Sequence, residues 1–152
     1  MRRSERAITV RAEMDAILNR AEVVYLAMGE GGAPYVVPMN FGYDGTALYL
    51  HSAVEGRKID ILRRQPRVSF VATTDYRSVS AETACGWTAR YRSVMGEGVA
   101  HLLESPEEKA KGLDILMAKF GVKPSPYPVT TLARLAVIKV DIHELSGKQN
   151  QG

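Results

Sequence analysis

Apolar and polar side chains alternate along much of this chain, with the period expected for half-buried β-strands. The alternation predicts strands over residues 22–28, 34–43 and 46–51. A glycine-rich segment at 29–32 and the Asp44-Gly45 pair separate these strands, and both are typical of hairpin turns. We therefore expect three consecutive antiparallel strands. The middle strand has one apolar face, formed by Tyr35, Val37, Met39, Phe41 and Tyr43.

Three further strands are expected in the rest of the chain. Residues 67–73 alternate between apolar and polar side chains. Residues 88–103 form a long strand in which Gly96 and Gly98 predict a bend or a bulge. The segment between these two strands, 74–87, is expected to be a loop. The last strand precedes a polar tail, and its apolar face consists of Ala136, Ile138, Val140 and Ile142.

Three stretches show the helical period of apolar residues instead. The first follows Thr9, a candidate N-cap. The second begins at a capping box, Ser52–Glu55, and ends by Gln65 because Pro66 follows. The third begins at Ser105, which heads a second capping box with a proline in the first turn. The expected buried positions are Met14, Ile17, Leu18 and Ala21, then Ile59 and Leu62, then Leu113, Leu116, Met117 and Phe120.

These elements predict an α+β fold in which six antiparallel strands form a small β-barrel with helices on its flanks. Closing the sheet would remove its exposed edges, although the order of the elements does not establish closure. With 152 residues, the chain is long enough for a single domain, residues 1–152, with its own hydrophobic core.

Charge and composition argue against several classes of protein. The 20 basic and 17 acidic residues give a net charge of +3, too balanced for the basic stripe of a nucleic-acid-binding protein. No apolar run reaches the ~20 residues that a membrane span needs, and the N-terminus lacks a signal-peptide pattern. Cys85 is the one cysteine, so no internal disulfide is expected. These features favour a cytoplasmic protein without nucleic-acid or membrane partners.

Residues 50–58 are the most informative segment for chemistry, because they pass from a predicted strand into a predicted helix. A helix N-terminus offers free backbone N–H groups and the positive end of the helix dipole, both of which favour an anion. Arg57 and Lys58 add two cations suited to a phosphate group. The alternative is a solvated basic helix start in which Ser52 only caps the helix. The residues alone leave both interpretations open.

A second candidate cluster lies in the long strand. Alternation places Arg90 and Arg92 on one face, and Tyr91 and Ser93 on the other. The two glycines that follow would let another group approach the backbone closely. An ordinary charged surface strand explains the cluster equally well.

Pro38 falls inside a predicted strand, where its missing N–H removes one donor from the ladder. Proline in this place indicates either an edge strand or a bulge. A bulge would turn the backbone amides of Met39 and Asn40 outward, toward the carbonyl groups of a flat ligand. The edge-strand interpretation is the simpler one and is favoured.

Other chemistries have little support in the sequence. His51, His101 and His143 are far apart and lack the spacing of metal ligands, so no metal site is expected. Cys85 has no neighbouring base, and Trp87 is better explained by packing. The chain also lacks a dinucleotide-binding fingerprint and a nucleotide-phosphate loop.

Five segments together match a known family. In sequence order they are Pro34-Tyr-Val-Val-Pro-Met-Asn-Phe41, Leu48-Tyr-Leu-His-Ser-Ala53, Gly56-Arg-Lys58, Tyr91-Arg-Ser-Val94 and Ser146-Gly-Lys148. With them the chain resembles the FMN-binding split-barrel proteins of the pyridoxamine 5'-phosphate oxidase-like superfamily, and among these the nitroimidazole-resistance (Nim-type) flavoproteins. Each segment is weak alone, but all five occur in the family's order and span nearly the whole chain.

The resemblance implies a six-stranded split barrel that forms a homodimer, with FMN bound at the interface between the two chains. It implies that Arg57 and Lys58 hold the FMN phosphate and that Val37, Met39 and Asn40 line the isoalloxazine ring. The full set of FMN-binding residues implied in this way is Val37, Pro38, Met39, Asn40, His51, Ser52, Arg57, Lys58, Tyr91, Ser93 and Lys148.

The resemblance further implies an FMN-dependent oxidoreductase that takes electrons from NAD(P)H and reduces a small organic acceptor, such as a nitroaromatic compound. His51 is the candidate catalytic residue, as a proton donor or as a steric wall of the substrate pocket. The chain lacks the basic, aromatic C-terminal segment of complete pyridoxamine phosphate oxidases, so that activity is disfavoured. The alternative is a non-catalytic flavin- or haem-binding module, and a deazaflavin in place of FMN stays open.

Overall fold

The computed structural model describes residues 3–30 and 33–151. Its strands are β1 (Ala7–Ile8), β2 (Val23–Glu30), β3 (Ala33–Asn40), β4 (Gly42–Tyr43), β5 (Ala47–Ala53), β6 (Arg67–Val79), β7 (Thr88–Leu103) and β8 (Leu135–Asn150). The helices are α1 (Arg11–Arg20), α2 (Arg57–Arg64), α3 (Pro106–Ala118) and α4 (Val129–Ala133), with short 3₁₀ turns η1 (Ser4–Arg6) and η2 (Ala84–Gly86). The predicted α+β class is confirmed. No helix in these residues is long and apolar enough to cross a membrane.

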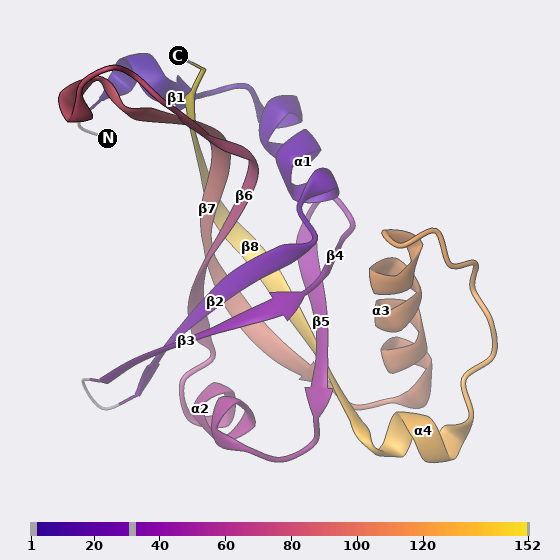
Figure 1. The fold of residues 1–152 in the computed structure, drawn as a ribbon. Coiled ribbons are helices and arrows are strands. Elements are labelled where there is room, and N and C mark those ends of the chain that lie inside the picture. Colours follow the sequence, from indigo (N-terminus) through magenta and orange to yellow (C-terminus); the bar gives the residue numbers. More distant parts are fainter. Residues whose placement is uncertain (1–2, 31–32, 152) are drawn as a thin grey trace.

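All eight strands belong to one antiparallel sheet with the order β3-β2-β6-β7-β8-β5-β4, and β1 pairs with the far part of β8. The sheet curls until β3 touches β5, but no ladder joins these two strands, so the barrel is split rather than closed (Figure 1). The prediction of six strands is wrong. The predicted strand 34–43 divides at Phe41, and the residues after it form β4, which pairs with β5 instead of β2.

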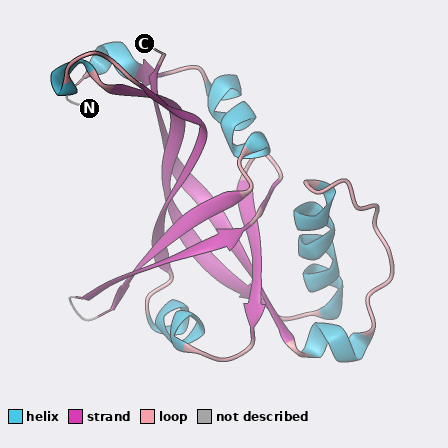
Figure 2. Ribbon diagram, viewed as in Figure 1, coloured by secondary structure: helices cyan, strands magenta, loops and turns pink. Residues whose placement is uncertain are grey.

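Two strands are longer than the sequence predicts. β6 continues to Val79, through half of the expected loop, and β8 continues to Asn150, through the expected polar tail. Both extensions pair with β7, whose bounds are as predicted. In these extensions the backbone hydrogen bonds of the ladder hold the strands together, and both faces are polar. The alternation of apolar residues therefore could not predict them. The far end of β6 and β7, residues 75–91, projects from the barrel as a hairpin arm (Figure 2).

The hydrophobic core fills the inside of the barrel, and α1 and α2 cover its two ends. The inner residues of β2 and β6 follow the expected alternation, with Leu26 and Phe70 almost fully buried. A Cβ at Gly96 would collide with the Phe70 ring. The group that approaches the backbone closely at Gly96 is therefore a core side chain of the protein itself. The β7–β8 ladder shifts its register after Glu97, which confirms the expected bulge.

The helix caps differ in how well they could be predicted. Ser105 forms the expected capping box with Glu108. Thr9 is not a cap, because α1 begins after Val10 without a side-chain cap. Ser52 is not a cap either, since it lies within β5, and α2 begins after Gly56. Phe120, expected in the buried stripe of α3, lies beyond the end of that helix and is 43% exposed.

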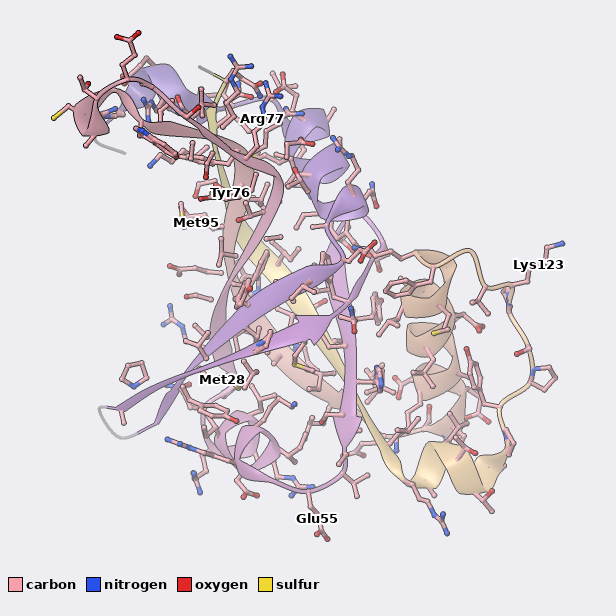
Figure 3. The ribbon with its side chains drawn as sticks, viewed as in Figure 1. Met28, Glu55, Tyr76, Arg77, Met95 and Lys123 are labelled. Carbon is pink, nitrogen blue, oxygen red and sulfur yellow. The ribbon has the colours of Figure 1, made fainter. Side chains whose placement is uncertain are left out.

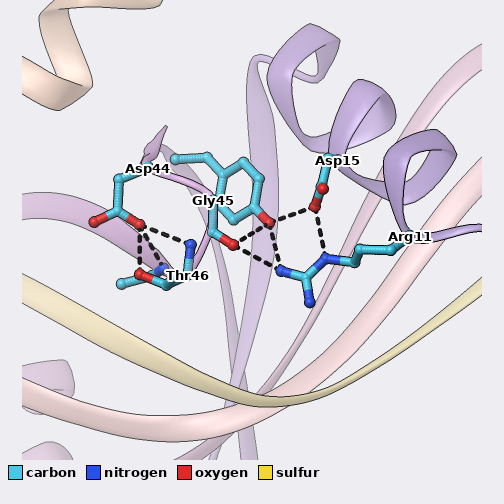
Figure 4. Close-up of polar contacts among 7 residues, drawn as sticks. Arg11, Asp15, Asp44, Gly45 and Thr46 are labelled. Carbon is cyan, nitrogen blue, oxygen red and sulfur yellow. Dashed lines mark hydrogen bonds and ion pairs between the residues drawn. The ribbon is translucent and has the colours of Figure 1, made fainter.

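A polar network fixes the β4–β5 turn against α1 (Figure 4). Arg11 donates to Asp15 at 2.8 Å and to the carbonyl oxygen of Gly45 at 2.7 Å, and the Tyr43 hydroxyl donates to Asp15 at 2.6 Å. Asp44 accepts hydrogen bonds from two backbone N–H groups of the turn. Gly45 has φ = 98°, the left-handed conformation that the predicted Asp-Gly turn requires.

Lys119 joins the end of α3 to the end of α1. Its Nζ donates to the carbonyl oxygens of Leu18 at 2.7 Å and Ala21 at 2.6 Å, and lies 3.4 Å from the centroid of the Phe41 ring. These carbonyls are at the C-terminus of α1, where the helix dipole favours a cation. Burial lowers the pKa of Lys119 to about 8, with a smaller opposing effect of Glu22.

We expect Lys119→Met to destabilise the fold by about 1–3 kcal/mol, because it leaves buried carbonyl groups without a donor. The pKa of Lys119 is lower in the fold than the ordinary lysine value of 10.5, so the unfolded chain holds this proton more tightly. The wild type should therefore gain stability over the variant as the pH rises from about 8 toward 10.5. Chemical denaturation across that range measures both effects. Lys123→Met, in an exposed loop, is the control and should change neither.

Candidate functional site

The first candidate group lies where β5 gives way to α2. Gly56 precedes the helix with φ = 120°, a conformation that a side chain would strain. Arg57 and Lys58 follow in the first turn of α2. The Arg57 guanidinium is exposed and lies over the ring of Tyr35 from β3, with Cζ 4.5 Å from the centroid. The cation–π contact fixes the arginine at the split between β3 and β5.

Lys58 is half-buried beside Arg57, and burial alone lowers its pKa. Partial burial of a positive charge costs free energy unless an anion lies close to it. A doubly charged phosphate would meet the exposed Arg57 guanidinium, the half-buried Lys58 ammonium and the N-terminal backbone of α2 together. The residues at the start of α2 therefore fit the phosphate end of a nucleotide cofactor.

His51 and Ser52 are neighbours in β5 and point to opposite faces of the sheet. Ser52 continues the inward-facing row of Leu48 and Leu50, and its hydroxyl donates to the carbonyl oxygen of Ala53. His51 lies on the other face, opposite Val137 of β8, and is exposed. The hydroxyl of Ser52 thus lies on the face opposite the imidazole.

The four candidate residues of β3 are also divided between two faces. Val37 and Met39 point into the barrel, and Met39 is buried in the core. Pro38 and Asn40 are on the outer face and exposed. The β2–β3 ladder runs without a register shift past Pro38, so the edge-strand interpretation is confirmed and there is no bulge. Asn40 donates to the carbonyl oxygen of Glu22 at 3.0 Å.

The second candidate group lies at the far end of β7 and β8. Ser93 is directly opposite Lys148, and its hydroxyl donates to the Lys148 carbonyl oxygen at 3.3 Å. The Lys148 Nζ is 6.0 Å from the centroid of the Tyr91 ring. The structure thus brings Tyr91, Ser93 and Lys148 together on the outer face, as one half-buried group.

The two groups are at opposite ends of one chain. His51 pairs with Val137 near the start of β8, and Lys148 is eleven residues further along that strand. At about 3.3 Å per residue, this separates them by ~36 Å along the strand. Figure 1 shows α2 at one end of the barrel and the paired ends of β7 and β8 at the other. A single chain cannot close both groups around one small molecule.

Between the groups, the outer face of β2, β3, β6, β7 and β8 is unusually apolar. Tyr25 is 50% exposed, Val36 55% and Met95 43%, and all three line a pocket of about 430 Å³. Met95 lies on the outer side of the sheet in Figure 3. The sequence alone did not identify this surface, because recognising it requires the pairing of the strands. Exposed apolar patches of this kind are typical of surfaces where another molecule binds.

The curled, split antiparallel sheet and the cationic start of α2 define a class of small barrel proteins. Residues 10–149 match the family model described as pyridoxamine 5'-phosphate oxidase, and the chain belongs to this family and to its split-barrel superfamily.

Solved structures agree with this assignment. The chain is similar to a proposed 5-nitroimidazole antibiotic resistance protein from Bacteroides thetaiotaomicron, with 32% identity and a TM-score of 0.84 over 94% of this chain and 86% of that one. It shares its fold with an FAD and haem binding protein from Mycobacterium smegmatis (22% identity, TM-score 0.84, 97% and 74% covered). It shares it also with an FAD-binding protein from Mesorhizobium loti (23% identity, TM-score 0.70, 96% and 98% covered).

Proposed function

We propose that this protein is an FMN-dependent oxidoreductase that takes electrons from NAD(P)H and passes them to a small organic acceptor, with nitroaromatic compounds among the candidates. Its family, and a fold shared with proteins described as flavin-binding, support a flavin as the cofactor. The similarity to a nitroimidazole resistance protein supports the acceptor class. FMN, with one phosphate group, suits the compact pair of cations at the start of α2.

The main support for a cofactor site shared by two chains is the distance between the two candidate groups. Arg57 and Lys58 lie at one end of the barrel, and Tyr91, Ser93 and Lys148 lie at the other. A homodimer that pairs the exposed apolar faces would bring the first group of one chain to the second group of its partner. Each dimer would then hold two equivalent FMN molecules, both at the interface.

In such a site each group of residues has its own task. Arg57 and Lys58 would bind the phosphate, and Lys148 would place a positive charge near the ring system. Pro38 and Asn40 present their side chains to the outer face, whereas Val37 and Met39 reach a ligand only through their backbone. When bound, FMN supplies the hydride chemistry, and the chain supplies binding, orientation and charge. Exposed His51 is the proposed proton donor to the acceptor, and Ser52 supports the β5–α2 turn.

The purified protein should be yellow, and its flavin absorption should bleach with NADPH or NADH and return when a nitroaromatic acceptor is added. Bleaching and recovery over several cycles measure turnover directly. A stable flavin spectrum without turnover would indicate a non-catalytic flavin module. A Soret band without flavin would indicate a haem protein and would contradict the proposed cofactor.

Arg57→Ala combined with Lys58→Ala should weaken FMN binding about a hundredfold or more, because each charge-assisted hydrogen bond contributes about 1.5–3 kcal/mol. Flavin fluorescence during titration of the apoprotein measures this affinity. Lys111→Ala with Lys123→Ala removes the same charge from exposed positions elsewhere and should leave the affinity unchanged. Full flavin occupancy in the first variant after dialysis would refute the phosphate assignment.

A site shared between two chains predicts complementation. One variant carries Arg57→Ala and Lys58→Ala, and the other carries Tyr91→Ala and Lys148→Ala. After the two are unfolded together and refolded, random pairing gives mixed dimers with one intact site each, so about a quarter of all sites should bind FMN normally. Each variant refolded alone is the control. No recovery in the mixture, or a monomer in solution, would show that the site belongs to one chain.

A further inference from the structure

A second cationic pocket lies where the hairpin arm leaves the barrel. It measures about 360 Å³ and is lined by Asp75, Tyr76, Arg77, Arg90, Tyr91 and Gln151. Tyr76 and Arg77 are at this junction in Figure 3, beyond Met95 along the sheet. The pocket is at the opposite end of the barrel from Arg57 and Lys58 of the same chain.

Two arginines that line this pocket are neighbours on adjacent strands. Arg77 of β6 and Arg90 of β7 are directly opposite in the ladder, an arrangement of like charges that destabilises a sheet. Within residues 3–30 and 33–151, neither side chain makes a hydrogen bond or an ion pair, and the Nε of Arg90 is buried without a partner. Such a pair is stable when an anion lies between the two guanidinium groups.

The neighbouring charges do not neutralise this pair. Among the described residues, Asp75 is the one acidic residue that lines the pocket, and both terminal nitrogens of Arg20 hold it, at 2.6 and 3.1 Å. Arg92 is paired with Glu13 at 2.8 Å. The described lining of the pocket therefore has a net positive charge from Arg77 and Arg90.

The backbone at the junction shapes the pocket. The β6–β7 ladder shifts its register between Thr74 and Arg77, and Asp75 has φ = 58°, which is unusual for a residue other than glycine. This irregularity lies beside Tyr76, which is 68% exposed and lines the pocket. The site thus combines two guanidinium groups with an exposed aromatic ring, the groups that bind a phosphate and a flat base.

We propose that this pocket binds the 2'-phosphate of NADPH and makes the protein prefer NADPH to NADH as its electron donor. This inference rests on the proposed function, in which Tyr91 flanks the flavin and also lines this pocket. Alternation places Arg90 and Tyr91 on opposite faces of β7, yet both line this pocket, which therefore reaches from one face to the other. A donor held by its phosphate at Arg77 and Arg90 would extend toward the flavin site, and its adenine would stack on Tyr76. Arginine is the usual partner of the 2'-phosphate in NADP-binding proteins.

The test compares NADP⁺ and NAD⁺, which differ by that one phosphate group, by calorimetric titration of the oxidised, flavin-loaded protein. The wild type should bind NADP⁺ at least about tenfold more tightly than NAD⁺. Arg77→Gln and Arg90→Gln should each remove most of this difference while leaving the NAD⁺ affinity unchanged. Arg77 is exposed, so its replacement tests the site even if the Arg90 variant does not fold.

Arg134→Gln removes the same charge from an exposed position at the end of α4 and should keep the wild-type preference. Equal affinity of the wild type for both dinucleotides would overturn the proposal, and so would a preference that persists in both pocket variants. The flavin content of every variant is read from its absorption spectrum. Absence of flavin from the wild type would count against the proposed function, whereas loss of the preference in a variant that keeps its flavin reports on this pocket alone.

Discussion

The paired length of β7 and β8 is the constraint on which the rest of the molecule depends. Each strand has 16 residues, and their ladder joins Tyr91 to Asn150 at one end and Leu103 to Val137 at the other. At one end it carries the hairpin arm and Lys148, and at the other β8 pairs with β5, which leads into α2. Because a β-ladder is stiff and has a fixed rise per residue, the two candidate groups cannot approach each other within one chain. If both groups bind one cofactor, as proposed, this length requires a second chain.

Two partly buried lysines differ in the partners that the protein supplies to their ammonium groups. Lys119 has two carbonyl oxygens and the Phe41 ring around its ammonium group, so the protein itself supplies its hydrogen-bond partners, although burial lowers its pKa to about 8. Lys58 also has a pKa lowered by burial, with no charged group among the causes. It lies beside Arg57 in the first turn of α2, where the helix dipole also favours an anion. The same reasoning separates Arg20 and Arg92, which have acidic partners, from Arg77 and Arg90, which have none among the residues that the structure describes.

The sequence predicts features whose causes are local and misses those set by the ladders. The Ser105 capping box and the Asp44-Gly45 turn are confirmed, because a few adjacent residues determine each of them. Ser52 has the same local signal as Ser105, yet pairing of β5 with β8 carries the strand past it and moves the helix start to Arg57. The pairing of Arg77 with Arg90 depends on a register shift after Thr74, and no pattern in the sequence predicts this shift. The resemblance names candidate site residues, which stay a prediction, but it does not show their division into two distant groups.

The outer face itself indicates how two chains would align. Glu97 and Glu144 are opposite each other on β7 and β8, Met95 and Ser146 form the next row, and Ser93 and Lys148 the one after. Negative charge therefore lies at one end of the face, apolar surface in the middle and a cation at the other end. If a two-fold axis runs parallel to these rows through Met95, the acidic row of each chain meets the Lys148 row of the other. An axis along the strands would instead oppose like charges. The favoured axis also turns the α2 end of one chain toward the Lys148 end of its partner, so the charge pattern and the proposed division of the cofactor site favour the same dimer.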